Sequence, residues 1–202
     1  MKPQPRYCLS FIDCIRNRLP DMKSISLLGG QVQGVVMGQG EPVLALHGFL
    51  DNAFSFKLLS AAMPEVEIWA LDLPGHGNSA ALAMAEGWSI TQWLPVLGRV
   101  MDELNWDTYT LLGHSLGAIL AQMLAVVDPR IKRLLCLDAL GPLTETDDGN
   151  LDRMQRSYRQ RQDSPGGRRY YPTTDALWQV RVGGRFPLSP ASARVLSSRG
   201  VG

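Results

Sequence analysis

The sequence has little cysteine and no long hydrophobic run. Its three cysteines, Cys8, Cys14 and Cys136, lie far apart and form no C-x-x-C pair, which argues against a disulfide framework and a zinc site. No stretch of about 18 apolar residues occurs, so no segment is expected to span a membrane. Residues 1–20 lack the continuous apolar stretch of a signal peptide. We therefore expect a cytoplasmic protein with no metal and no other cofactor.

A strong excess of charge of either sign is also missing. The formal net charge is +1, which gives no reason to expect binding to nucleic acid or to a membrane surface. The charge is unevenly spread, because residues 150–202 hold ten of the 20 basic side chains and three of the 19 acidic ones. No aromatic residues are interleaved there as in a nucleic-acid-binding module. We interpret these arginines as a solvated face and expect no nucleic-acid partner.

Short apolar runs alternate with helical patterns over the first two thirds of the chain. A total of 202 residues is enough for one domain with a core. Two β-type runs separated by glycines predict a hairpin, and four later apolar runs predict strands covered on both faces. Between them, apolar residues spaced at about 3.6 positions predict helices. The predicted strands are 24–28, 32–37, 43–46, 67–73, 109–112 and 134–137. The predicted helices are 53–62, 116–127 and, between them, one that a possible capping box at Ser89 and Gln92 opens and that has apolar residues from Trp93 to Leu104.

This alternation predicts an α/β fold, with a mostly parallel sheet and helices on both of its faces. Functional residues of such sheets lie beyond the carboxyl ends of the strands. Four predicted strands end in residues suited to a site: His47-Gly48, Pro74-Gly75-His76-Gly77, Gly113-His114-Ser115 and Asp138.

The sharpest motif is G-x-S-x-G at residues 113–117, between a predicted strand and a predicted helix. This context is typical of a nucleophile elbow, a turn so tight that its central serine has a strained backbone. Side chains two positions before and after that serine would collide, which accounts for Gly113 and Gly117. The pattern predicts Ser115 as a nucleophile at the positive end of the following helix. A glycine-rich turn without chemistry is the alternative.

A serine nucleophile needs two backbone N–H groups that hold the developing oxyanion. Leu116, the residue after the nucleophile, can supply one of them. The segment after the predicted strand 43–46 can supply the other, with Phe49 as the donor and Gly48 allowing a close backbone approach. Alternatively, His47-Gly48 only turns the chain.

Together these motifs resemble the α/β-hydrolase superfamily, and within it the serine-hydrolase-like, esterase-type branch. The resemblance covers roughly residues 24–145 and rests on segments 43–49, 72–79, 111–117 and 137–138. It implies a serine nucleophile, a histidine base, an acid that orients the histidine, and a helical lid inserted after the strand that ends near Asp138. Serine rather than aspartate at position 115 differs from the branches that use an aspartate nucleophile, such as haloalkane dehalogenases and epoxide hydrolases.

The base that the resemblance implies has no match. In this fold the chain order is serine, then acid, then histidine, but His47, His76 and His114 all precede Ser115. His114 adjoins the nucleophile, and adjacent strand residues point to opposite faces. His47 is expected to shape the oxyanion loop. His76 lies in a loop at the correct sheet edge and could approach, although a structural role is favoured for all three.

Two aspartates are candidates for the acid. Asp138 follows the strand after the predicted nucleophile helix, a position that some members of the superfamily use; it could instead cap the loop that begins there. Asp175 lies in the basic tail and is the weaker candidate.

We therefore expect an N-terminal extension at 1–22, an incomplete α/β-hydrolase core at 23–145 and a partial helical lid at 146–202. The expected function is hydrolysis of a small-molecule ester or related acyl substrate, by a chain that we expect to be truncated before its catalytic histidine. The alternative is a non-catalytic pseudo-hydrolase, or a small-molecule- or protein-binding module, on the same fold. The sequence predicts no oligomeric state.

Overall fold

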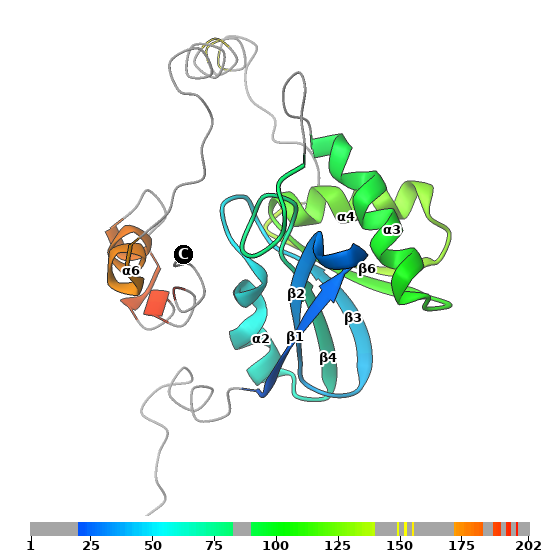
Figure 1. Ribbon diagram of the computed structural model, residues 1–202, viewed down its shortest axis with the longest axis horizontal. Coiled ribbons are helices and arrows are strands. Elements are labelled where there is room, and N and C mark those ends of the chain that lie inside the picture. Colours follow the sequence, from blue (N-terminus) through cyan, green and yellow to red (C-terminus); the bar gives the residue numbers. More distant parts are fainter. Residues whose placement is uncertain are drawn as a thin grey trace, which may run out of the picture.

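A six-stranded sheet forms the centre of the protein. The computed structural model describes residues 20–82, 90–139 and 172–183, together with 149, 152, 155, 188–190, 193, 194 and 197. The strands lie in the order β1-β2-β4-β3-β5-β6 (Figure 1). Their bounds are β1 Met22–Leu27, β2 Val32–Met37, β3 Glu41–Leu46, β4 Val66–Leu71, β5 Tyr109–His114 and β6 Ile131–Leu137.

The sheet is mixed, with its parallel part in the centre and at one edge. β1 and β2 form the predicted antiparallel hairpin, and β2 also pairs antiparallel with β4. The hairpin turns through a 3-10 segment, Leu28–Gly30, in which Gly29 has a φ of 63°. β4, β3, β5 and β6 are parallel to one another. The parallel strands bring their carboxyl ends to one edge, where the candidate residues lie.

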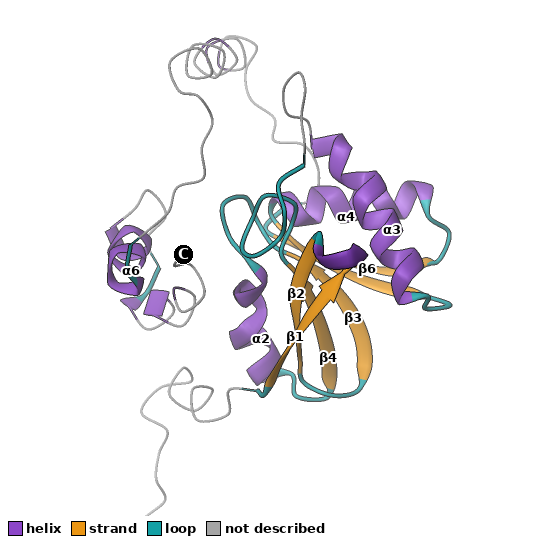
Figure 2. Ribbon diagram, viewed as in Figure 1, coloured by secondary structure: helices purple, strands orange, loops and turns teal. Residues whose placement is uncertain are grey.

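Helices cover both faces of the sheet, as the sequence predicts (Figure 2). On one face lie α3 (Leu94–Leu104) and α4 (Leu116–Val127), which share a core with the sheet. On the other face lie the 3-10 helix η2 (Ala53–Phe56) and α2 (Lys57–Ala62). Pro95 lies in the first turn of α3, where a missing N–H and a fixed φ are tolerated.

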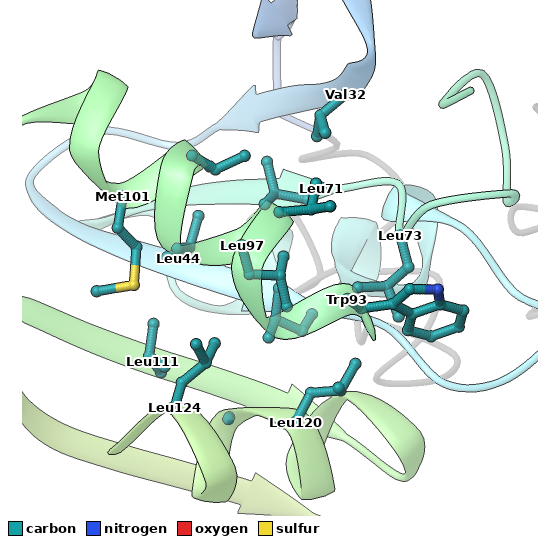
Figure 3. Close-up of a cluster of buried hydrophobic side chains, with 14 of the residues drawn as sticks. Val32, Leu44, Leu71, Leu73, Trp93, Leu97, Met101, Leu111, Leu120 and Leu124 are labelled. Carbon is teal, nitrogen blue, oxygen red and sulfur yellow. The ribbon is translucent and has the colours of Figure 1, made fainter. Parts of the chain in front are cut away.

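The strand pleat divides the core into two layers. In β3, Leu44 and Leu46 face the α3–α4 side, whereas Val43 and Ala45 face the η2 side. Figure 3 shows the larger layer, in which Leu97 of α3 and Leu120 of α4 lie near the leucines of the strands. Burial of each such side chain contributes roughly 1.5–3 kcal/mol. This packing fixes where β3 and β5 end, and therefore where the site residues lie.

The prediction of a buried strand at 134–137 is wrong. Leu134, Leu135 and Leu137 of β6 are 38%, 50% and 43% exposed, and β6 is the last strand on its side of the sheet among the described residues. The helix at 116–127 has the predicted bounds but is not buried all round, since Val126 and Val127 at its end are 85% and 68% exposed. An apolar sequence reports the preference of a segment for burial, whereas actual burial needs a neighbouring element to cover it.

Outside the sheet, the described part of the basic tail contains α6 (Thr174–Gly183). Most of the predicted extension at 1–22 and of the predicted lid at 146–202 lies outside the described residues. Within the described parts of the chain, no helix is long and apolar enough to cross a membrane.

Candidate active site

Ser115 occupies a tight turn between β5 and α4, at the carboxyl edge of the sheet. Its backbone has a φ of 50° and a ψ of −114°, a conformation that non-glycine residues rarely adopt. The turn leaves no room for side chains on either side. A Cβ on Gly113 would lie 2.3 Å from the Cα of Ala118, and one on Gly117 would lie 2.0 Å from the carbonyl oxygen of Leu46. The two glycines are therefore required by sterics, as the motif predicts.

The turn leads directly into a helix N-terminus. The N–H groups of Ala118 and Ile119 donate to the carbonyl oxygen of Ser115 at 3.0 and 3.2 Å. Leu116 is the first residue of α4, so the helix itself offers its N–H no acceptor. The helix dipole adds partial positive charge at this end. A negative charge that develops beside Ser115 would be stabilised here.

The segment after β3 lies against the serine. A Cβ built on Gly48 would lie 3.0 Å from Nδ1 of His114 and 3.4 Å from Cβ of Ser115. The chain then turns tightly, because the N–H of Asp51 donates to the carbonyl oxygen of Gly48 at 3.2 Å. We call residues 48–51 the oxyanion turn, after the role that the sequence predicts for Phe49. It includes the predicted donor Phe49, so the structure brings this segment and Ser115 together.

His47 is a buried, neutral clamp. The N–H of Leu73 donates to its Nε2 at 3.0 Å, so Nε2 carries no proton, and Nδ1 donates to the carbonyl oxygen of Gly48 at 2.7 Å. Burial is the main cause that lowers the pKa of His47 from 6.5 to about 4, and nearby His76 and His114 lower it further. The ring joins the ends of β3 and β4, which supports the predicted role in shaping the loop.

His76 forms a hydrogen bond with the backbone of the oxyanion turn. The N–H of Leu50 donates to its Nε2 at 3.2 Å, and its Nδ1 lies 3.1 Å from the carbonyl oxygen of Pro74. Its ring also meets those of Phe49 and Trp93, with centroids 6.0 and 5.6 Å away. Both ring nitrogens of His76 thus contact backbone groups, which supports a structural role for this histidine.

Of the two candidate acids, Asp138 lies beside the serine turn. β5 and β6 pair His114 with Leu137, and the N–H of Ser115 donates to the carbonyl oxygen of Leu137 at 2.8 Å. Asp138 is therefore one residue beyond this contact. It is exposed and has a φ of 60°. Asp175 is exposed in the first turn of α6.

Sequence reasoning assigned no role to Asp72, which is fully buried at the end of β4. Its carboxylate accepts hydrogen bonds from the N–H groups of Ala53, at 2.8 Å, and Asn78, at 2.9 Å. A Cβ on Gly77, whose φ is 48°, would lie 2.3 Å from this carboxyl carbon. Asp72 thus ties the segment after β3 to the loop that carries His76. The sequence signal for this role was an aspartate at the end of a predicted strand, two positions before the Pro-Gly-His-Gly segment.

The described residues include no group of three or more histidine, cysteine or acidic side chains that could hold a metal ion.

Comparisons with known proteins show which sequences and structures this chain is similar to. A probable serine hydrolase of Drosophila melanogaster is 38% identical over 125 residues, which cover 59% of this chain and 38% of that protein. A hypothetical protein from Pseudomonas aeruginosa PAO1 has a crystal structure that is similar with a TM-score of 0.70 and 31% identity, over 89% of this chain and 65% of that one. The thioesterase domain from the curacin biosynthetic pathway is similar with a TM-score of 0.66 and 27% identity, over 89% of this chain and 65% of that one.

The chain thus spans about two fifths of the length of its Drosophila relative. The family model for the alpha/beta hydrolase family matches residues 43–199, which include the oxyanion turn, the serine turn and α6. Since this match covers most of the sequence, the chain belongs to the alpha/beta hydrolase family.

Proposed function

We propose that this chain carries the nucleophile and the oxyanion hole of a serine hydrolase that acts on carboxylic esters or related acyl compounds. Ser115 is the nucleophile, and the N–H groups of Phe49 and Leu116 hold the oxyanion. The observation that carries the proposal is the strained backbone of Ser115 between two sterically required glycines, with Gly48 so placed that a Cβ on it would lie 3.4 Å from the Cβ of Ser115. Storing strain at one serine is typical of a functional site.

In the proposed reaction, Oγ of Ser115 attacks the carbonyl carbon of the substrate. A C–O bond forms, the carbonyl π electrons move to oxygen, and the hydroxyl proton passes to a base. The resulting oxyanion is held by the two backbone N–H groups, which are worth more than donors in water because they are already oriented. In the collapse of this intermediate the bond to the leaving oxygen or sulfur breaks, the protonated base gives its proton to that atom, and the alcohol or thiol departs from an acylated serine that water then hydrolyses.

The proposed reaction needs a group that accepts the proton of the Ser115 hydroxyl. His47 and His76 both bind backbone groups through their two ring nitrogens. We therefore propose that neither is the base, and that in this chain the proton passes to water or to an added base. We propose Asp138 as the acid that orients a histidine base, because it follows β6 beside the serine turn. Catalysis by the chain alone is expected to be slow.

The substrate class is proposed from two sources. The motif placement is that of acyl transfer, and the relatives include a probable serine hydrolase and a thioesterase domain. The same proposal includes a small-molecule substrate, a cytoplasmic location and no cofactor.

The second candidate function is a non-catalytic binding protein on the same fold. It is favoured by one observation, namely that His47 and His76 serve as structural clamps. This candidate predicts a serine that is strained but unreactive.

A fluorophosphonate probe separates the two candidates. Intact-mass spectrometry would follow adduct formation with and without added imidazole, which supplies the base. The proposal predicts one adduct per chain, faster labelling with rising imidazole concentration, and no adduct in Ser115→Ala. Ser24→Ala, which alters an exposed serine of β1, is the matched control and is expected to label like the wild type. Absence of labelling at every imidazole concentration would favour the binding protein, and labelling of Ser115→Ala would refute the proposed nucleophile.

A further inference from the structure

A helix far along the sequence makes an ion pair with the oxyanion turn. Nη2 of Arg181, in α6, lies 2.8 Å from Oδ1 of Asp51, the last residue of the turn and 130 positions earlier. The side chains of Arg181 and Asp51 are only 14% and 18% exposed. α6 is drawn in orange in Figure 1. A pair this well shielded interacts more strongly than a surface pair, because water screens it less.

The ion pair acts on the backbone of the turn through Asp51. Burial alone would raise the pKa of Asp51, but the charge of Arg181 and hydrogen bonds from Arg181 and Ser55 outweigh it and lower the pKa. The carboxylate is therefore ionised at neutral pH. Its Oδ1 also accepts from the N–H of Asn52 at 3.0 Å. The Asn52 side chain in turn accepts from the N–H of Phe54 and caps η2.

Burial contributes little to the position of the two central side chains of this turn, although the ring of Phe49 has an edge contact with that of His76. Phe49 and Leu50, its two central residues, are 58% and 71% exposed. Leu50 has a φ of 60°, which is unfavourable for a leucine and needs other contacts to hold it. The turn is held by polar contacts: the N–H of Leu50 to His76, the N–H of Asp51 to Gly48, and the ion pair with Arg181.

Burial of the Arg181 guanidinium also carries an unfavourable free-energy contribution. Its Nε is buried and has no hydrogen-bond partner among the described residues. A buried ion pair with an unsatisfied N–H contributes little net stability. A role in orientation explains the contact better than a role in stability.

We propose that Arg181 is a positioning residue, whose ion pair with Asp51 holds the N–H of Phe49 beside Ser115, so that docking of α6 and assembly of the oxyanion hole are coupled. This inference rests on the proposed function and extends it. The side chain at position 181 would then affect the rate of attack by Ser115, although it does not contact the reacting atoms. A misplacement of about 1 Å in such a site can cost about 100-fold in rate.

The test combines hydrogen–deuterium exchange with labelling kinetics on the 202-residue chain. The variants are Arg181→Gln, Asp51→Asn, their double variant, and Arg181→Lys, which keeps the charge. Arg133→Gln is the matched control, since it removes an exposed ion pair with Glu41. Labelling by a fluorophosphonate with imidazole present forms the Oγ–P bond, releases fluoride and passes the hydroxyl proton to imidazole. It is measured as a maximal rate and a half-saturating concentration.

The expected result is faster exchange in peptides covering residues 47–56 and a maximal labelling rate about tenfold or more lower in both single variants. The half-saturating concentration is expected to change little, Arg181→Lys to retain most of the rate, and the double variant to be no slower than the slower single variant. Arg133→Gln is expected to match the wild type in both measurements. If Arg181→Gln is unfolded by circular dichroism, Asp51→Asn and Arg181→Lys still provide the comparison.

Unchanged exchange at 47–56 in Arg181→Gln, or rate losses that multiply in the double variant, would overturn the inference. A wild-type protein that is not labelled would refute the proposed function instead. In that case the exchange data alone decide whether α6 holds the turn.

Discussion

His47 is expected to make the stability of this protein fall as the pH falls. The ring is fully buried and its pKa is lowered from 6.5 to about 4. Between these values the unfolded chain binds a proton that the folded protein does not, so the free energy of unfolding decreases with acidification. At about pH 5 the medium is roughly 1.5 units below the unfolded pKa and still above the folded one. At about 1.4 kcal/mol per unit, the loss relative to pH 7.5 is about 2 kcal/mol.

The assay is urea unfolding, followed by far-UV circular dichroism, at several pH values between 7.5 and 5. The test variant is His47→Gln, whose side-chain oxygen can still accept from the N–H of Leu73 but does not titrate. The stability of wild type minus that of the variant is expected to fall by about 2 kcal/mol over this range. An equal pH dependence in wild type and His47→Gln would refute the account of His47 as a buried neutral clamp.

Three further predictions concern stability and are tested by the same urea assay at neutral pH. Gly117→Ala is expected to destabilise the protein by about 3 kcal/mol or more, because its Cβ would overlap backbone atoms of β3, whereas Gly98→Ala, in open space on α3, is expected to stabilise it by roughly 0.5–1 kcal/mol. Equal effects of the two would contradict the steric argument. Asp72→Asn is expected to cost about 1.5–3 kcal/mol, since an amide nitrogen cannot accept from the backbone N–H that it would face; a cost near zero would argue against its role as a buried link. Leu135→Ala on the exposed edge is expected to cost under about 1 kcal/mol, against about 2–5 kcal/mol for Leu111→Ala in the core, and a reversed order would contradict the observed burial.

Local patterns predicted the part of the site that is built from consecutive residues. The strand at β5, the turn at Ser115 and the helix from Leu116 to Val127 follow from apolar periodicity interrupted by glycines. The steric requirement for Gly113 is also local, because a Cβ there would meet backbone atoms of Gly117 and Ala118 in the same turn, whereas a Cβ on Gly117 would meet Leu46 and His47, which are distant in the sequence. These local features could therefore be predicted from the sequence.

Features that depend on distant neighbours were not predictable in the same way. The apolar sequence of β6 indicates burial, but exposure depends on whether another element covers that edge. The roles of Asp72 and of the pair between Asp51 and Arg181 depend on loops brought together by the sheet. An aspartate at a strand end is equally compatible with a cap, a catalytic acid or a buried link until its partners are known.

A crystal structure of the chain after reaction with a fluorophosphonate tests most directly whether Ser115 is the nucleophile and whether Phe49 and Leu116 hold the oxyanion. The account predicts a phosphorus atom bonded to Oγ of Ser115, with one phosphonyl oxygen about 2.7–3.1 Å from the backbone nitrogens of both Phe49 and Leu116. A phosphonyl oxygen that points away from these two nitrogens, or an adduct on another residue, would contradict it.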